Sequence, residues 1–152
     1  TAEQVRSLAS SAPTPKCGAA IMLLAYTGLR ASELLRLPAT PTRSASLMVA
    51  NSKTGRGREV PIVSTVRPYL RHLPLGCSYR TLVGWFWQAR EAAGMPHVRL
   101  HDLRHTTASL LANAGVDLYT IGKILGHRAT QTTARYAHLT DATVRKAMRR
   151  IG

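Results

Sequence analysis

One segment of this chain is apolar on almost every side of a helix. It runs from Lys16 to Tyr26 and is followed by Thr27 and Gly28, where glycine is a common helix stop. A helix without a polar face is stable only when other elements surround it. The longest apolar run in it, Ala19 to Tyr26, is well short of the roughly 20 residues that cross a bilayer. The segment therefore predicts a central, buried helix in a globular domain.

The rest of the chain combines helical patterns with one hairpin signal. The letters TAEQ at Thr1 have the form of a capping box, which predicts a first helix. LMVAN and REVPIV are typical of two strands around the turn SKTGRG, a β-hairpin with a basic tip. Asp117 is suited to cap a helix that closes at Gly126. Further helices are predicted over Arg30 to Leu37, Ser64 to His72, Arg80 to Ala93, His101 to Ala114, Thr130 to Ala137 and Asp141 to Arg150.

These elements predict one α+β domain over residues 1–152, mostly α-helical, with a small antiparallel hairpin. The 152 residues are enough for one core, and no internal repeat divides them. Hydrophobic residues make up 45% of the chain and charged residues 18%, a balance that favours a folded protein over a disordered one. We expect the hairpin tip, the segment 101–105 and the chain after Gly126 to lie close together in the fold.

The chain is strongly basic. It has 21 Lys and Arg against 7 Asp and Glu, a formal net charge of +14 and a pI near 11.2, which predict a polyanionic partner. No basic amphipathic anchor or signal peptide is visible, so nucleic acid is favoured over a membrane surface. Cys17 and Cys77 stand alone, without the spacing of a zinc cluster or a disulfide framework. We therefore expect reduced thiols and a cytoplasmic protein.

The stretch HDLRH at 101–105 places two histidines and an arginine together on a predicted helix. At about 100° per residue, His101 and Arg104 lie roughly 60° apart. A guanidinium and an imidazole at that spacing can reach one small anion, such as a phosphate diester. We therefore expect His101, Arg104 and His105 to lie opposite an apolar face formed by Leu103, Thr107, Leu110, Leu111 and Ala114.

Other interpretations of these residues stay open. The polar side chains of 101–105 can simply form a solvated helix face. The pattern also echoes the zinc-protease motif H-E-x-x-H with Asp102 in place of Glu, although Arg104 beside a dication is unfavourable and no third ligand is assigned. Elsewhere, Arg30 can pair with Glu33 one turn on, and His127 can cap the helix that ends before it.

Five motifs, taken in chain order, resemble the catalytic domain of the tyrosine recombinases, the phage-integrase family. They are TGLRASELLRL at 27–37, SKTGRGREVPI at 52–62, HDLRHTTASLLANAG at 101–115, LGHR at 125–128 and ARYAHL at 134–139. The resemblance implies that family's fold, and we expect its N-terminal core-binding domain to be absent from this chain. It also implies a catalytic set of Arg30 and Arg104 on the phosphate, Lys53 as proton donor, His101 and His127 as further site residues, and Tyr136 as nucleophile.

The reaction that this resemblance implies is DNA cleavage and rejoining through a 3′-phosphotyrosyl link, without metal, ATP or another cofactor. A phenol has a pKa of about 10, so its attack on phosphorus at neutral pH needs nearby cations or a base. Two arginines on the non-bridging oxygens would supply charge that a metal ion supplies elsewhere. Since the phosphotyrosine retains the bond energy, rejoining would need no nucleotide.

The implied partner is double-stranded DNA in a bacterial or phage setting, with assembly up to a tetramer on DNA and accessory DNA-bending proteins. We expect phosphate contacts, which give affinity rather than sequence choice, from Arg56, Arg58, Arg128 and Arg135. Residues 110–139 also have the rhythm of a helix-turn-helix, so a DNA-binding regulator without catalysis stays open. A type IB topoisomerase-like enzyme would share the tyrosine chemistry, and only the joining of two different DNA partners separates it from a recombinase.

Overall fold

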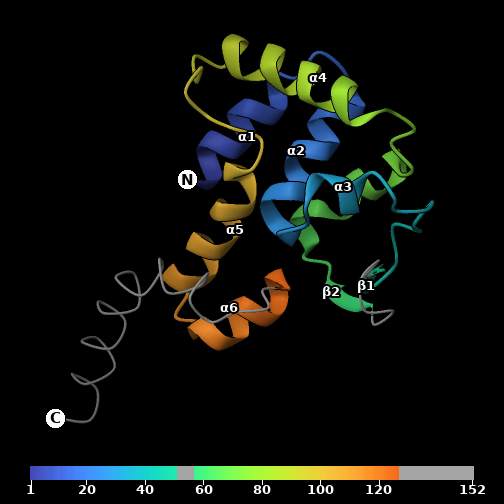
Figure 1. The fold of residues 1–152 in the computed structure, drawn as a ribbon, viewed down its shortest axis with the longest axis vertical. Helices are drawn as coiled ribbons and strands as arrows, with labels where there is room; N and C mark the ends of the chain where they lie inside the picture. Colours follow the sequence, from blue (N-terminus) through green and yellow to red (C-terminus); the bar gives the residue numbers. More distant parts are fainter. Residues whose placement is uncertain (51–56, 127–152) are drawn as a thin grey trace, which may run out of the picture.

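The computed structural model describes residues 1–50 and 57–126, and helix α2 (Pro15–Thr27) lies at its centre (Figure 1). The Thr14 side chain accepts a hydrogen bond from the Cys17 backbone N at 3.1 Å, and proline occupies the first helical position. Gly28, with φ of 64°, ends the helix in the left-handed conformation that suits glycine. Every residue from 17 to 25 is buried. The predicted central helix is therefore confirmed.

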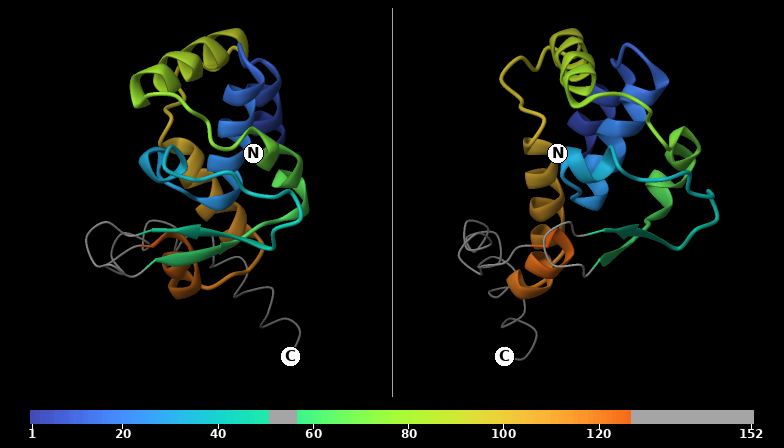
Figure 2. Two further views of the ribbon diagram at one scale, coloured as in Figure 1. Left: turned by 90° about the vertical axis from the view of Figure 1, so that its right-hand side faces the viewer. Right: turned by 45° about the vertical axis from the view of Figure 1, so that its right-hand side comes forward.

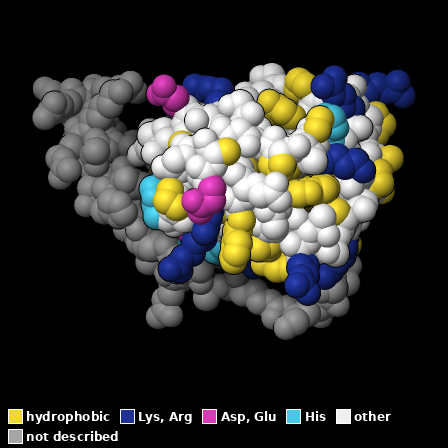
Figure 3. Space-filling model, turned by 90° about the horizontal axis from the view of Figure 1, so that it is seen from above, with side chains coloured by type: hydrophobic (Ala, Val, Ile, Leu, Met, Phe, Trp, Pro, Cys, Tyr) yellow, Lys and Arg dark blue, Asp and Glu magenta, His cyan; other side chains and the backbone are white. Residues whose placement is uncertain are grey.

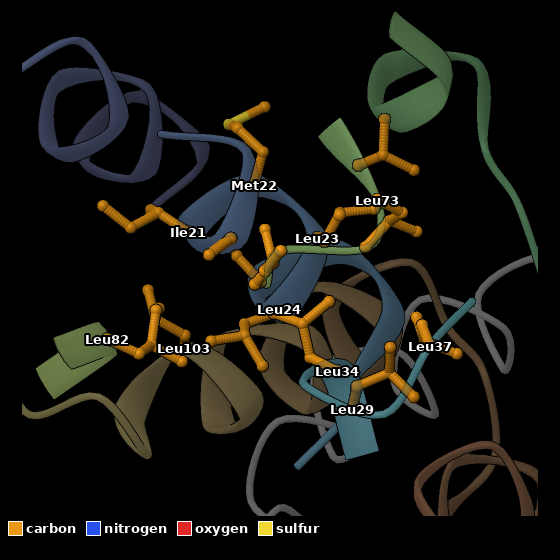
Figure 4. Close-up of a cluster of buried hydrophobic side chains, with 14 of the residues drawn as sticks. Ile21, Met22, Leu23, Leu24, Leu29, Leu34, Leu37, Leu73, Leu82 and Leu103 are labelled. Atoms are coloured by element: carbon orange, nitrogen blue, oxygen red, sulfur yellow. The ribbon is translucent and has the colours of Figure 1, made fainter. Parts of the chain in front are cut away.

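Helices surround α2. It contacts α1 (Ala2–Ser10), α3 (Ala31–Leu34), the 3₁₀ helix η1 (Ser64–His72), α4 (Tyr79–Ala92) and α5 (Asp102–Asn113). Figure 4 shows Leu23 and Leu24 of α2 among leucines from these neighbours, including Leu82 and Leu103. Each fully buried leucine contributes about 1.5–3 kcal/mol. Within the described part of the chain, no helix is long and apolar enough to cross a membrane.

The two strands form the predicted antiparallel hairpin. Strand β1 (Ser46–Val49) pairs with β2 (Arg58–Pro61), with Leu47 opposite Val60. Leu47, Val49 and Val60 are buried, so one face of the hairpin packs on the core. The predicted basic tip lies within 51–56, outside the described residues.

Helix α6 (Leu118–Leu125) lies beside the hairpin, at the end of the molecule opposite α4 (Figures 1 and 2). The Asp117 carboxylate accepts from the Thr120 backbone N at 2.9 Å, and Gly126 ends the helix with φ of 67°. α6 packs on α5 through a small second core formed by Ala108, Ala112, Ile121 and Leu125. The helices predicted after Gly126 lie outside the described residues.

Two elements differ from the sequence prediction. Helix α3 covers only Ala31–Leu34 instead of continuing to Leu37. Leu37 precedes Pro38, and the residue before a proline is disfavoured in helical geometry, so the chain turns out of the helix early. The segment Ser64–His72 is a 3₁₀ helix, and Pro68 inside it has no N–H to donate to a helical hydrogen bond.

Candidate active site

Arg30 and His101 line the same pocket, which has a volume of about 200 Å³. Arg30 is the residue before α3, and His101 is the residue before α5, so the fold brings two helix beginnings together. Tyr79, at the start of α4 and 58% exposed, contributes a third side to the pocket. The other lining residues are Leu24, Leu29, Ala31, Ser32 and Leu100. The pocket therefore offers a cation and an imidazole over a mostly apolar floor.

Arg30 is held by the carboxylate of Glu33. The Arg30 backbone N donates to Glu33 Oε2 at 2.8 Å, and its side-chain Nη1 donates to Oε1 at 3.1 Å. The alternative in which these two residues form an ion pair one turn apart is therefore confirmed. The Arg30 side chain is nevertheless 47% exposed, so the ion pair leaves one side of the guanidinium open to solvent. Arg30 can therefore pair with Glu33 and line the pocket at the same time.

The Arg104 side chain is buried, contrary to the prediction that it lies on the face of α5 opposite the apolar one. Arg104 is 4% exposed and donates to two backbone carbonyls, those of Gly28 and Leu125. These carbonyls lie at the C-terminal ends of α2 and α6, where backbone oxygens lack helical partners and the helix dipole is negative. Two helix ends therefore draw a polar side chain inward.

The predicted apolar face of α5 is also partly wrong. Of the predicted face, Leu103 and Thr107 are buried, Leu110 and Leu111 are only partly buried, and Ala114 is exposed. Ala108 and Ala112, which were not predicted to belong to it, are buried. α5 is packed against α2 on one side and α6 on another, so its buried surface is not a single stripe. Thr107, like Arg104, is a buried polar residue that donates to a backbone carbonyl, since its hydroxyl donates to the carbonyl of Ala25 in α2 at 2.8 Å.

The two histidines of the 101–105 stretch contact each other. The rings of His101 and His105 lie edge to face, with centroids 4.9 Å apart. Asp102, the acid of the zinc-like pattern, accepts from the Arg99 backbone N at 2.8 Å and so stabilises the start of α5. Within residues 1–50 and 57–126, no three His, Cys, Asp or Glu side chains are grouped as metal ligands.

Arg58 makes three contacts that the sequence did not suggest. Its Nη1 and Nη2 donate to the two carboxylate oxygens of Glu33, at 2.9 and 2.8 Å, and its Nε donates to the Ile124 carbonyl at 3.2 Å. The guanidinium thus joins β2 to α3 and α6. The sequence offered one clue, the acid three residues after Arg30, but nothing in it indicated that Glu33 binds a second arginine.

Glu33 is kept ionised by these neighbours. Burial by itself would raise the pKa of its carboxyl, but hydrogen bonds from Arg58 and from the Arg30 backbone, together with both positive charges, lower it from 4.5 to about 2. The Glu33 side chain is only 12% exposed, so solvent screens these charges weakly. One carboxylate therefore serves two arginines at neutral pH.

The remaining predicted site residues lie outside the described residues. They are Lys53, Arg56, His127, Arg128, Arg135 and Tyr136. Seen from the α4 end, the described surface shows Lys and Arg side chains around an area that also contains apolar groups (Figure 3). On α4, the Arg90 guanidinium lies 5.3 Å from the ring of the exposed Trp87.

The family match and the similar proteins agree on one protein family. Residues 1–143 match the phage integrase family. The chain is 31% identical to the tyrosine recombinase XerA of Saccharolobus solfataricus and 33% identical to the tyrosine recombinase XerC of Erythrobacter litoralis, each over 90% of this chain. The alignments cover 50% and 51% of those relatives, so the chain spans about half of their length.

The fold is also similar to that of a solved structure, the catalytic domain of bacteriophage HP1 integrase. The TM-score is 0.75 at 27% identity, and the match covers 98% of this chain and 92% of that one. This similarity confirms the fold predicted from the five motifs.

Proposed function

Because this chain belongs to the phage integrase family, we propose that it is the catalytic domain of a site-specific DNA recombinase, which cuts and rejoins strands through a phosphotyrosine. The observation that carries the proposal is the pocket in which Arg30 and His101 meet. The near-complete match to a structure described as a catalytic domain supports assigning residues 1–152 to a single catalytic unit.

The chemistry assigns separate tasks to the arginines and the tyrosine. Arg30 and Arg104 neutralise the non-bridging oxygens of the scissile phosphate and stabilise the charge that builds up in the transition state. Tyr136 Oη attacks phosphorus and the bond from phosphorus to the 5′ oxygen breaks, which leaves a 3′-phosphotyrosine. The ends of α2 and α6 hold the Arg104 guanidinium through two backbone carbonyls.

Proton transfers complete the reaction. Lys53 donates a proton to the leaving 5′ oxygen, and His101, with His127 as a further site residue, assists the proton movements around the phosphate. The 5′ hydroxyl of another strand then attacks the phosphotyrosine, which restores a diester and frees the phenol. One diester is exchanged for another, so neither a metal nor a nucleotide enters the balance.

The proposed substrate is double-stranded DNA. The charge of +14 supports a polyanionic partner, and phosphate contacts are assigned to Arg56, Arg128 and Arg135. Arg58 was predicted to join this group, and its guanidinium donates to Glu33 and to the Ile124 carbonyl. Assembly of up to four copies on DNA, accessory DNA-bending proteins and action in the cytoplasm are part of the same proposal.

The test is a covalent adduct that survives denaturation. The protein is incubated with nicked duplexes that carry a randomised segment, at low salt and with a chelator, and is then run on a denaturing gel. We expect a slower protein–DNA band for the wild type and none for Tyr136→Phe. Tyr119→Phe is the matched control, because Tyr119 is an exposed tyrosine on α6 outside the proposed site.

The outcomes separate the alternatives. An adduct in both tyrosine variants would move the nucleophile to another residue. DNA binding without any adduct would favour the helix-turn-helix regulator. An adduct that rejoins only its own strand would favour the topoisomerase-like enzyme, whereas joining of two different duplexes supports the recombinase.

A further inference from the structure

Arg58 connects three elements that are distant in the sequence. It belongs to β2, it contacts both carboxylate oxygens of Glu33 in α3, and its Nε reaches the Ile124 carbonyl in the last turn of α6. Two parallel N–H···O bonds to one carboxylate fix both the distance and the orientation of the pair. Only a planar guanidinium can make this fork and a third contact at the same time.

The carboxylate that Arg58 holds is the one that positions Arg30. The Glu33 carboxylate accepts hydrogen bonds from the Arg30 backbone N at 2.8 Å and from Arg30 Nη1 at 3.1 Å. Without Arg58, the Glu33 side chain would lose two of its hydrogen bonds and could rotate away from Arg30. The position of the pocket cation therefore depends on a residue that does not line the pocket.

The same guanidinium holds the end of α6. Ile124 and Leu125 present consecutive carbonyls, of which the first accepts from Arg58 and the second from Arg104. Gly126 packs against Arg58 so closely that a Cβ at this position would lie 3.0 Å from Arg58 Nη1. The end of α6 is thus fixed between the arginine of β2 and the buried arginine of α5.

We propose that Arg58 is a positioning residue, which orients Arg30 through Glu33 and fixes the end of α6 beside Arg104, rather than a contact to DNA phosphate. All three of its guanidinium nitrogens donate to protein oxygens. The inference rests on the proposed recombinase function, because Arg30 and Arg104 are assigned to the phosphate there.

The first experiment compares two DNA substrates in the adduct assay with the full chain. Both substrates carry the sequence that the wild type cleaves among the randomised duplexes, one with the ordinary phosphate and the other with a neutral methylphosphonate at the cleaved position, where no negative charge needs a cation. Arg58→Met should slow adduct formation about 100-fold on the phosphate, as expected for a misplaced catalytic group. On the methylphosphonate, the variant should differ from the wild type by no more than about threefold. Equal slowing on both substrates would overturn the proposal.

Two further variants make the result specific. Arg6→Met removes one exposed arginine from α1 and controls for net charge, so it should react like the wild type. Arg58→Lys keeps the charge but cannot contact both carboxylate oxygens and Ile124 together, so it should remain at least about tenfold slow. Full activity in Arg58→Lys would show that charge alone suffices and would overturn the three-contact role.

A second measurement does not depend on activity. The ¹³C signal of the Glu33 carboxyl, followed by NMR against pH, should show a pKa near 2 in the wild type and a clearly higher pKa in Arg58→Met, closer to 4.5. An unchanged titration would overturn the proposal even if the wild type cleaves DNA. A raised pKa together with an inactive wild type would support the contact to Glu33 and reject the recombinase function.

Discussion

The molecule holds its two described arginines of the proposed site in different ways. The α2–α5 seam, formed by the packing of these helices and by Thr107 and Arg104, relies on apolar contacts and neutral backbone carbonyls. The α3–β2–α6 junction, formed by Glu33, Arg58 and Ile124, relies on one ionised carboxylate. The seam should therefore be less sensitive to acid than the junction, which should weaken when Glu33 takes up a proton.

This difference matters for how each arginine can act. Arg104 is buried and bonded to two helix ends, so its direction is set once the domain is folded. Arg30 is half exposed and held by a side chain that is itself held by another side chain. We infer that the seam holds its cation through neutral backbone groups, while the junction orients Arg30 through two charged side chains in series.

The largest effect is expected from breaking the seam with Arg104→Met. Two carbonyls, of Gly28 and Leu125, would lose their donor inside the protein, at about 1–3 kcal/mol each. Loss of a preorganised donor from a transition state costs about 100- to 1000-fold in rate. Urea unfolding should show the first effect and the adduct assay the second. Arg6→Met is the control, and a fully stable Arg104→Met would contradict the account of the seam.

A smaller, pH-dependent effect is expected from breaking the junction with Glu33→Gln. The folded state lowers the pKa of Glu33 from 4.5 to about 2, so the carboxylate contributes about 3 kcal/mol that is present above pH 4.5 and is lost as the pH falls toward 2. Glu33→Gln should thus be less stable than the wild type at pH 7, by up to that amount.

Urea unfolding at several pH values between 7 and 3 checks this window. The difference in the free energy of unfolding between the wild type and Glu33→Gln should be constant down to about pH 5 and should shrink below it. Arg104→Met should show less narrowing, since the carbonyls of Gly28 and Leu125, which lose a donor, do not titrate. A constant gap across the whole range would mean that Glu33 is not stabilised by its charge.

The sequence predicted individual helices and strands better than the contacts between them. The buried helix α2 follows from a segment without a polar face, and the hairpin follows from alternating apolar residues around a turn. Both are local patterns. The burial of Arg104 was missed, because the carbonyls that attract it lie 76 and 21 residues away in the chain, and helical periodicity carries no information about such partners.

The candidate site was predicted in the same uneven way. Arg30 and His101 were identified by motif, and the fold brings them to one pocket. The pairing of Arg30 with Glu33 could be read from their spacing of three residues. The link from Glu33 to Arg58, 25 residues away, could not, because a basic residue after a hairpin turn is equally typical of a phosphate contact.

The smallest effect isolates the contact between α6 and Arg58. Gly126→Ala must adopt a φ of 67° and also displace the Arg58 guanidinium, which would lie 3.0 Å from the new Cβ. Gly94→Ala is the matched control, because Gly94 has a φ of 68° but no atom within 4 Å of such a Cβ. Backbone strain alone costs about 1–2 kcal/mol in both variants, so any excess in Gly126→Ala measures the junction. We expect an excess of about 0.5–1 kcal/mol by urea unfolding, and its disappearance when Arg58→Met is added to both variants. An excess that persists without the guanidinium would place the strain elsewhere at the end of α6.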